Sequence, residues 1–182
     1  MFPLLDDELF KSNIPGPTKQ EIRAISISKM RIFPGCKILE IGTGTGAMTS
    51  DLERMGCYVV SLEFNDYISL SPGKKIAIGS DFIQALSPNF WVRSAIFDSV
   101  FIGGTVNISG SIKLAHNVLK NKGSIVINSF TLDGMSKIVR ALTRWFNRFE
   151  VIEVQISKAE VLGHHKALVA RNPIFIFYAS KA

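Results

Sequence analysis

The chain has 182 residues, of which 47% are hydrophobic and 20% charged, a composition that excludes an intrinsically disordered segment. This length suits one domain with a central sheet covered by helices. No apolar run reaches the roughly 20 residues that a membrane span requires, and the N-terminus is acidic where a secretion signal would be basic. We therefore expect a cytoplasmic protein with a single domain over residues 1–182.

The chain carries an excess of positive charge. Lys and Arg number 21 against 15 Asp and Glu, which gives a formal net charge of +6. This excess favours an anionic partner, either a nucleic acid or a polycarboxylate, although a solvated basic surface would also explain it.

The two cysteines, Cys36 and Cys57, are too few for a disulfide framework or a zinc site. We expect buried free thiols in a reducing compartment, and no metal.

An irregular arm is predicted over residues 1–17, because prolines near its end exclude a helix. The spacing of Thr18 and Glu21 is that of a capping box, so a helix should begin at Thr18 and end at Pro34. Strands and helices then alternate, and the later helices should end near residues 54, 121 and 146. Strands are predicted over residues 37–41, 58–63, 76–79, 96–102, 124–130, 149–157 and 174–179.

This alternation predicts an α/β fold with a mainly parallel, seven-stranded sheet and helices on both faces. The last two strands have no helix between them. They should therefore close the edge of the sheet as an antiparallel pair.

A glycine loop follows the first strand, in the order Gly42, Thr43, Gly44, Thr45, Gly46. Glycines allow a tight turn and the close approach of a ligand, and the next helix offers free N–H groups. Glu63 ends the second strand, where it can accept both ribose hydroxyls of an adenosine ligand. Asp81 and Phe82 should follow the third strand and contact adenine, unless Asp81 only caps a short helix.

Glu40 helps to choose among cofactors. The letters Gly42-x-Gly44-x-x-Ala47 also fit a dinucleotide fingerprint. A diphosphate would be repelled by Glu40, whereas the sulfonium and amino groups of S-adenosylmethionine would be attracted. With Glu40 included, the pattern resembles the first motif of Rossmann-like methyltransferases, whose acid and loop hold the methionine part of the cofactor. We expect S-adenosylmethionine, with NAD and a purely structural loop as alternatives.

Segments over residues 14–29, 101–104 and 162–176 narrow the class further. Together they are similar to the decarboxylating precorrin methyltransferases of anaerobic cobalamin biosynthesis, and the resemblance spans about residues 9 to 180. It implies methylation of carbon 15 of a cobalt-precorrin tetrapyrrole and loss of the carboxyl group of its ring-C acetate. Residues 64–80 depart from the family, because they leave room for about one helical turn where members usually have a proper helix.

The same resemblance implies site residues and an assembly. The cofactor would contact Thr18, the glycine loop, Glu63 and the turn at Asp81 and Phe82, with residues 1–36 covering the site. A homo-oligomer, specifically a tetramer, is implied as well. A precorrin carries several carboxylates, which suits the positive net charge of the chain.

Substrate-binding residues are expected from family-like segments and from strand ends on the ligand face of the sheet. These are Lys19, Arg23, Lys29, Gly103, Gly104, Asn107, Asn128, Thr131 and Arg171. Asn107 is equally suited to cap the following helix. His164 and His165, expected in the last loop, are candidates for the proton donor in the decarboxylation, or are a solvated surface pair.

Two other functions remain open at this point. An RNA methyltransferase would also be basic, but residues 1–36 contain no RNA-binding module. The Asn/Asp-Pro-Pro-aromatic sequence typical of enzymes that methylate exocyclic base nitrogens is also missing after the fourth strand. The second alternative is a non-catalytic NAD-binding protein, against which Glu40 argues.

Overall fold

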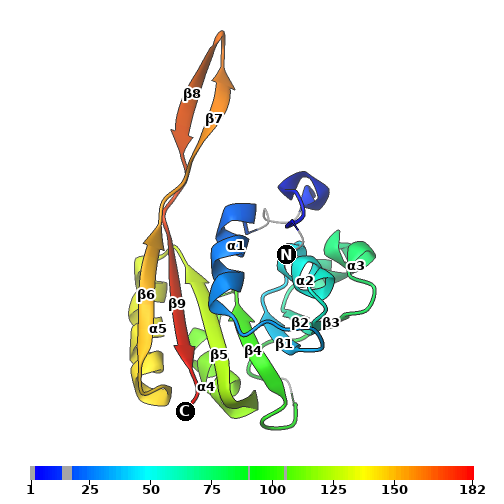
Figure 1. Cartoon of the computed structure of the whole chain (residues 1–182), viewed down its shortest axis with the longest axis vertical. Coiled ribbons are helices and arrows are strands. Elements are labelled where there is room, and N and C mark those ends of the chain that lie inside the picture. Colours follow the sequence, from blue (N-terminus) through cyan, green and yellow to red (C-terminus); the bar gives the residue numbers. More distant parts are fainter. Residues whose placement is uncertain (1–2, 14–17, 90, 105) are drawn as a thin grey trace.

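The computed structural model describes residues 3–13, 18–89, 91–104 and 106–182. A seven-stranded sheet in the order β3-β2-β1-β4-β5-β9-β6 forms its centre (Figure 1). The strands are β1 (Lys37–Ile41), β2 (Tyr58–Glu63), β3 (Asp81–Gln84), β4 (Phe97–Ile102), β5 (Leu119–Ser129), β6 (Phe149–Val154) and β9 (Ile174–Ser180). The helices are α1 (Gln20–Lys29), α2 (Ala47–Arg54), α3 (Gly73–Ile76), α4 (Ile108–Val118) and α5 (Leu132–Trp145). Two 3-10 helices are η1 (Asp7–Phe10) and η2 (Asp66–Leu70).

The predicted fold class is confirmed. β3, β2, β1, β4 and β5 are parallel, and β9 runs antiparallel to both β5 and β6, so that the pair β6 and β9 closes the edge of the sheet. Alternate side chains of the central strands enter two cores. On β1, Leu39 packs with apolar residues of α4 and α5, whereas Ile38 packs with residues of α1 and α2. Helices therefore cover both faces of the sheet.

The third strand was placed wrongly by the sequence prediction. Ile76 is the last residue of the short helix α3, residues 77–79 follow this helix, and the strand β3 begins at Asp81, paired with Val60 of β2. Asp81 therefore starts a strand instead of following one. Residues 64–80 contain η2 and α3, each about one turn long.

The beginning of the chain also differs from the prediction. The arm contains the turn η1, and α1 begins at Gln20, with Lys19 as its N-cap and no side-chain capping bond. Thr18 does not cap the helix, and its carbonyl instead accepts a hydrogen bond of 2.6 Å from Arg23. The helix ends at Lys29, before the predicted stop at Pro34. Residues 14–17, the end of the predicted arm, lie outside the described residues.

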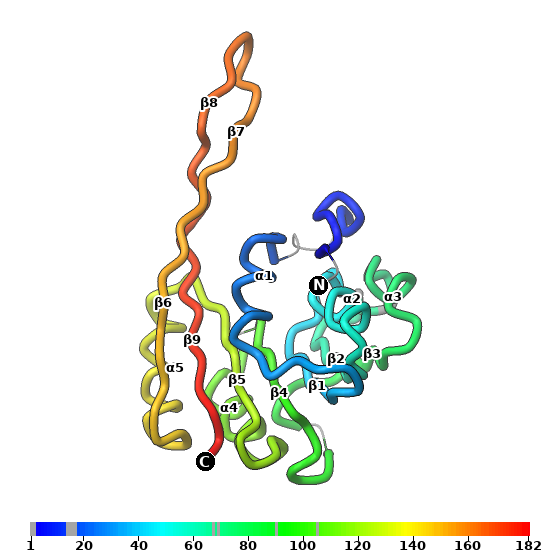
Figure 2. The backbone as a smooth tube through the Cα atoms, in the orientation of Figure 1, coloured from blue at the N-terminus to red at the C-terminus, as the bar shows by residue number. Residues whose placement is uncertain are grey.

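A β-hairpin extends away from the body of the molecule, formed by β7 (Ser157–Leu162) and β8 (His165–Ala170) (Figures 1 and 2). The prediction of a loop in this part of the chain was wrong. The hairpin continues from β6 and leads back into β9, and its turn contains Gly163, whose positive φ of 62° suits glycine.

The expectation of two free thiols was also wrong. Cys36 and Cys57 form a disulfide, with their Cα atoms 4.6 Å apart. Each cysteine directly precedes one of two adjacent parallel strands, and Lys37 pairs with Tyr58. The register of β1 and β2 therefore brings the two sulfurs together, and the cysteines give no support for a reducing compartment. Among the described residues no helix is both long and apolar enough to cross a membrane.

Candidate cofactor and substrate site

A cavity of about 880 Å³ lies at the carboxyl ends of the parallel strands. This volume is near the upper end of the range for ligand pockets, and ligands of open α/β sheets bind at this edge. The glycine loop, the end of β2 and the turns after β4 and β5 contribute to the lining. The N-terminal segment, the start of α1 and the root of the hairpin complete it.

The three glycines of the loop have different roles. All three have positive φ, 90° for Gly42, 52° for Gly44 and 76° for Gly46. A Cβ on Gly42 would lie 2.6 Å from the backbone nitrogen of Gly104, and one on Gly46 would lie 2.8 Å from the Cα of Gly73. A Cβ on Gly44 would meet nothing within 4 Å. Gly42 and Gly46 thus permit close packing of the backbone, and only Gly44 of the three faces open space.

Glu63 is held at the end of β2 beside this loop. The side chain is 6% exposed and lines the cavity. Its Oε2 accepts a hydrogen bond of 3.0 Å from the backbone nitrogen of Gly44, and its Oε1 accepts bonds from the backbone and side-chain nitrogens of Asn65 at 3.0 and 2.9 Å. Each carboxylate oxygen has two lone pairs, so Oε2, which accepts one bond, retains an acceptor site for a ligand hydroxyl, whereas both lone pairs of Oε1 are already used.

Glu40 is buried beneath the loop and also lines the cavity. Its Oε2 accepts hydrogen bonds from the hydroxyls of Thr49 and of Ser61, the latter at 2.8 Å. Ser61 is bonded in turn to Thr43 at 2.6 Å. Burial raises the pKa of the Glu40 carboxyl to about 7, although the two hydroxyl donors act to lower it. This carboxyl is therefore poised to change charge near neutral pH.

Of the other residues predicted to bind the cofactor, some line the cavity and others do not. Thr18, Thr43 and Thr45 line the cavity with Gly42 and Gly44. Gly46, Asp81 and Phe82 are not among the lining residues. Asp81 lies three residues before the end of β3, and its carboxylate accepts a hydrogen bond from the hydroxyl of Tyr58. Phe82 packs near Gly46. The cavity is instead lined after β3 by Ala85, Leu86 and Ser87.

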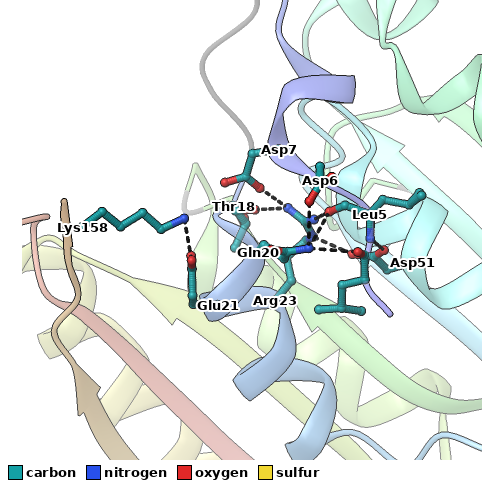
Figure 3. A network of polar contacts seen from close by, with 10 residues as sticks. Leu5, Asp6, Asp7, Thr18, Gln20, Glu21, Arg23, Asp51 and Lys158 are labelled. Atoms are coloured by element: carbon teal, nitrogen blue, oxygen red, sulfur yellow. Dashed lines mark hydrogen bonds and ion pairs between the residues drawn. The ribbon is translucent and has the colours of Figure 1, made fainter. Parts of the chain in front are cut away.

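Arg23 is not available to a substrate, contrary to the sequence prediction. Its side chain is fully buried, with Nε 2.6 Å from Asp51 Oδ2 and Nη1 2.7 Å from Asp7 Oδ1 (Figure 3). Its guanidinium also donates to the carbonyls of Leu5 and Thr18. Asp51 accepts a further bond of 2.8 Å from the backbone nitrogen of Leu5. Arg23 therefore fastens the N-terminal segment, which contributes Asp6, Asp7 and Glu8 to the lining, onto α1 and α2.

Several predicted substrate residues do line the cavity. Gly103 and Gly104 lie against Gly42, and Asn107 caps α4 by accepting a bond from Gly110, as the alternative interpretation predicted. Thr131 caps α5 in the same way. Asn128 is 9% exposed and exchanges hydrogen bonds with Ser26 on α1, at 3.0 and 3.1 Å.

The predicted charged residues are more scattered. Lys19 and Arg171 line the cavity, but Lys29 does not, and its Nζ lies 4.6 Å from the centre of the Tyr178 ring. His164 and His165 are exposed at the tip of the hairpin, outside the cavity lining of their own chain. The structure gives them no place in the site of a single subunit.

Sequence reasoning missed one wall of the cavity. Val154, Ile156, Lys158 and Ile174 line it from the root of the hairpin, and Glu21 lines it from α1. The alternation of Val154, Ile156 and Lys158 with residues of opposite orientation is a strand signal. The strand predicted over residues 149–157 includes Val154 and Ile156, but it ends before Lys158, and the path of the hairpin that brings this segment to the cavity was not predicted.

The sheet order and the site at its carboxyl edge define this protein as a Rossmann-like methyltransferase. The sequence model of a family described as precorrin methyltransferase domain matches residues 10–181. The chain therefore belongs to the precorrin methyltransferase family. This membership decides against the RNA methyltransferase and the NAD-binding protein considered above.

Individual relatives agree with this membership. A protein of Sulfurisphaera tokodaii named cobalt-precorrin-6B C(15)-methyltransferase (decarboxylating) is 31% identical, with 97% of this chain and 96% of the relative covered. A Methanococcus vannielii protein of the same name is 33% identical, with 97% and 98% covered. The crystal structure of precorrin-6y C5,15-methyltransferase from Geobacter metallireducens superposes with a TM-score of 0.88 at 29% identity, with 97% of both chains covered.

Proposed function

We propose that this protein is an S-adenosylmethionine-dependent C-methyltransferase. It methylates carbon 15 of a cobalt-precorrin and decarboxylates the ring-C acetate, a step of anaerobic cobalamin biosynthesis. The observation that carries the proposal is the position of Glu63, a buried carboxylate bonded to Gly44 in a cavity of about 880 Å³. Such a cavity has room for a nucleoside cofactor and part of a large second ligand. The names of the relatives describe the same reaction.

The residues present fit S-adenosylmethionine. Glu63 Oε2 would accept a ribose hydroxyl, and the open space at Gly44 would admit the ligand close to the backbone. Glu40 would attract the amino group of the methionine part. For adenine we propose the wall formed by Phe64 and Leu86 in place of Asp81 and Phe82, because only the first two line the cavity. When bound, the cofactor supplies a methyl group activated by a sulfonium.

The contribution of the protein to methyl transfer is mainly alignment. The nucleophile is a carbon of an electron-rich macrocycle, which requires no strong base. Holding the two reactants in line can contribute roughly 7–11 kcal/mol. Val106 and Phe130 line the cavity and are 76% and 66% exposed, so apolar surface is available to a flat macrocycle.

In the decarboxylation, carbon dioxide leaves from the acetate and its electron pair passes to the macrocycle. A proton then adds to the side-chain carbon, which becomes a methyl group. Apolar side chains near the carboxylate favour this step because they exclude water. His164 and His165 lie at the hairpin tip, outside the cavity lining, so another group donates this proton within one subunit.

We propose further that the protein is a homotetramer in the cytoplasm and that the hairpin takes part in assembly. Val161, Leu162 and Leu168 on the hairpin are 70%, 53% and 74% exposed. An isolated two-stranded hairpin is only marginally stable in water, so a partner surface would stabilise it. Replacing Val161 and Leu168 with serine should lower the mass measured by sedimentation or light scattering. An unchanged mass would show that these two hairpin side chains are not needed for assembly.

The proposed activity is tested in two stages. Calorimetric titration with S-adenosylhomocysteine should give micromolar binding, about −8 kcal/mol. Incubation with S-adenosylmethionine and the cobalt-precorrin substrate should then give a product that has gained a methyl group and lost carbon dioxide, by mass spectrometry. A product with the methyl group but without loss of carbon dioxide would limit the activity to methylation. Lack of S-adenosylhomocysteine binding would contradict the proposal.

A further inference from the structure

One wall of the cavity is formed at the root of the hairpin, by Val154, Ile156, Lys158, Arg171 and Ile174. None of these residues is among those proposed to bind the cofactor. This wall continues β6 and β9, which lie at the opposite end of the sheet from β2 and β3 (Figure 1). A second ligand held against this wall would therefore face a cofactor held at Glu63 and the glycine loop.

This wall changes from apolar to cationic with distance from the sheet. Val154, Ile156 and Lys158 are alternate residues of one extended segment, so they share a face, and all three line the cavity. Arg171 directly follows β8 on the returning segment, where its backbone nitrogen donates to the carbonyl of Ile156 at 2.8 Å. Ile174 follows it closer to the sheet and lines the same cavity. Two cations thus lie beyond a patch of aliphatic side chains.

Each of the two cations is paired with a glutamate of the chain. Lys158 Nζ lies 2.5 Å from Glu21 Oε1 (Figure 3), and Arg171 contacts Glu160. The Lys158 and Arg171 side chains are 41% and 46% exposed, so both remain accessible. The second oxygen of Glu21 is buried without a hydrogen-bond partner among the described residues. Partly exposed ion pairs contribute little to stability, so a competing anion can engage these cations at low cost.

We propose that Lys158 and Arg171 form a carboxylate clamp, which binds peripheral carboxylates of the precorrin while Val154, Ile156 and Ile174 pack against its macrocycle. This inference rests on the proposed function and assigns the orientation of its substrate. An ammonium has three donor protons and a guanidinium has five, so each cation can keep its glutamate and also bind a substrate carboxylate. Glu21 then positions Lys158 but repels the incoming carboxylate, which limits affinity.

Cobyrinic acid, a stable corrinoid polycarboxylate, and its fully esterified form are the probes for this clamp. The two differ in charge but share the macrocycle, so their comparison separates charge recognition from packing. Both are titrated by absorbance into the protein saturated with S-adenosylhomocysteine. The variants are Lys158→Ala, Arg171→Ala and Glu21→Gln. Lys166→Ala is the matched control, because Lys166 lies on the same hairpin but does not line the cavity.

Lys158→Ala and Arg171→Ala should each weaken binding of cobyrinic acid by about tenfold to a hundredfold. Binding of the ester and of S-adenosylhomocysteine should stay within about twofold in both variants, because neither depends on these two charges. Glu21→Gln should strengthen binding of cobyrinic acid by about twofold to fivefold, because one like charge is removed. In a protein that already carries Lys158→Ala, Glu21→Gln should change the affinity for cobyrinic acid less than it does in the unmodified protein. Lys166→Ala should match the unmodified protein.

Equal binding of cobyrinic acid by Lys158→Ala and the unmodified protein would overturn the clamp, as would an equal loss for acid and ester. Thermal unfolding of each variant checks that a loss of binding is not a loss of folding. If the unmodified protein binds S-adenosylhomocysteine but neither corrinoid, the proposed substrate itself is wrong, and this result is distinct from failure of the clamp alone.

Discussion

Arg23 Nε and Asp51 Oδ2 lie 2.6 Å apart in an ion pair in which neither side chain is more than 1% exposed. A buried charge that loses its partner is strongly destabilising. Arg23→Met should therefore lower the free energy of unfolding by about 3–5 kcal/mol, measured by urea denaturation. Lys19→Ala, at an exposed position on the same helix end, should change it by no more than about 0.5 kcal/mol. A stable Arg23→Met variant impaired only in KM would restore Arg23 as a substrate residue.

Glu63 and Asp81 make a matched pair of carboxylates, of which only Glu63 lines the cavity. Glu63→Ala should weaken binding of S-adenosylhomocysteine by about tenfold to a hundredfold, because a charge-assisted hydrogen bond to the ribose is lost. Asp81→Ala should leave the dissociation constant within about twofold, because it removes only an exposed contact with Tyr58. Calorimetry measures both dissociation constants. A larger loss of affinity in Asp81→Ala than in Glu63→Ala would indicate that the adenosine binds beside Asp81.

Alanine at Gly44 and at Gly42 should affect different properties. At Gly44 the added Cβ enters open space, and the positive φ of 52° costs about 1–2 kcal/mol. We expect a folded protein that binds S-adenosylhomocysteine poorly. At Gly42 the Cβ would lie 2.6 Å from a backbone nitrogen, so Gly42→Ala should unfold well below the temperature of Gly44→Ala. Equal melting temperatures for the two variants would contradict the different roles assigned to these glycines.

The charge of Glu40 should make cofactor binding depend on pH. Its pKa is raised by burial to about 7, so the carboxyl becomes negative between about pH 6 and pH 8. Affinity for S-adenosylhomocysteine should rise over this interval, because the ionised carboxylate attracts the ligand amino group. In Glu40→Gln this rise should disappear. A variant that keeps the same pH profile would assign the titration to another group.

The same raised pKa has the opposite effect on stability. Because the folded protein holds this proton more tightly than the unfolded chain, the stabilising contribution is complete below the ordinary glutamate pKa of 4.5 and is lost as pH rises through about 7. Glu40→Gln should therefore be more stable than the unmodified protein at pH 8, as judged by thermal unfolding. Lower stability of the variant at that pH would show that the hydrogen bonds from Thr49 and Ser61 require the charge.

Most of the sheet could be predicted because its central strands are short buried apolar runs between turn residues. The third strand could not. Residues 76–79 are apolar, but Ile78 among them is 85% exposed, whereas β3 begins and ends with exposed polar residues at an edge of the sheet. Local hydrophobicity therefore favoured the wrong segment, and Asp81 was placed at the wrong end of its strand.

The candidate site was predictable where its residues are close in sequence to a strand end. Glu40, Gly44 and Glu63 follow from β1 and β2 alone. Arg23 was misjudged because its burial depends on Asp51, which is 28 residues away, and on the fold of the N-terminal segment. Lys158 was missed because its position in the cavity depends on the path of the hairpin root, which no local pattern determines.

The disulfide between Cys36 and Cys57 lies at the amino ends of β1 and β2. β1 has five residues, so the bond is roughly 16 Å from the glycine loop along the strand. In the unfolded chain it closes a loop with a sequence separation of 21, a constraint of about 3 kcal/mol by chain entropy. Oxidation would thus raise the free energy of unfolding from a position that lies away from the glycine loop. The disulfide and the cavity therefore lie at opposite edges of one sheet, and reduction of the bond should change stability more than cofactor binding.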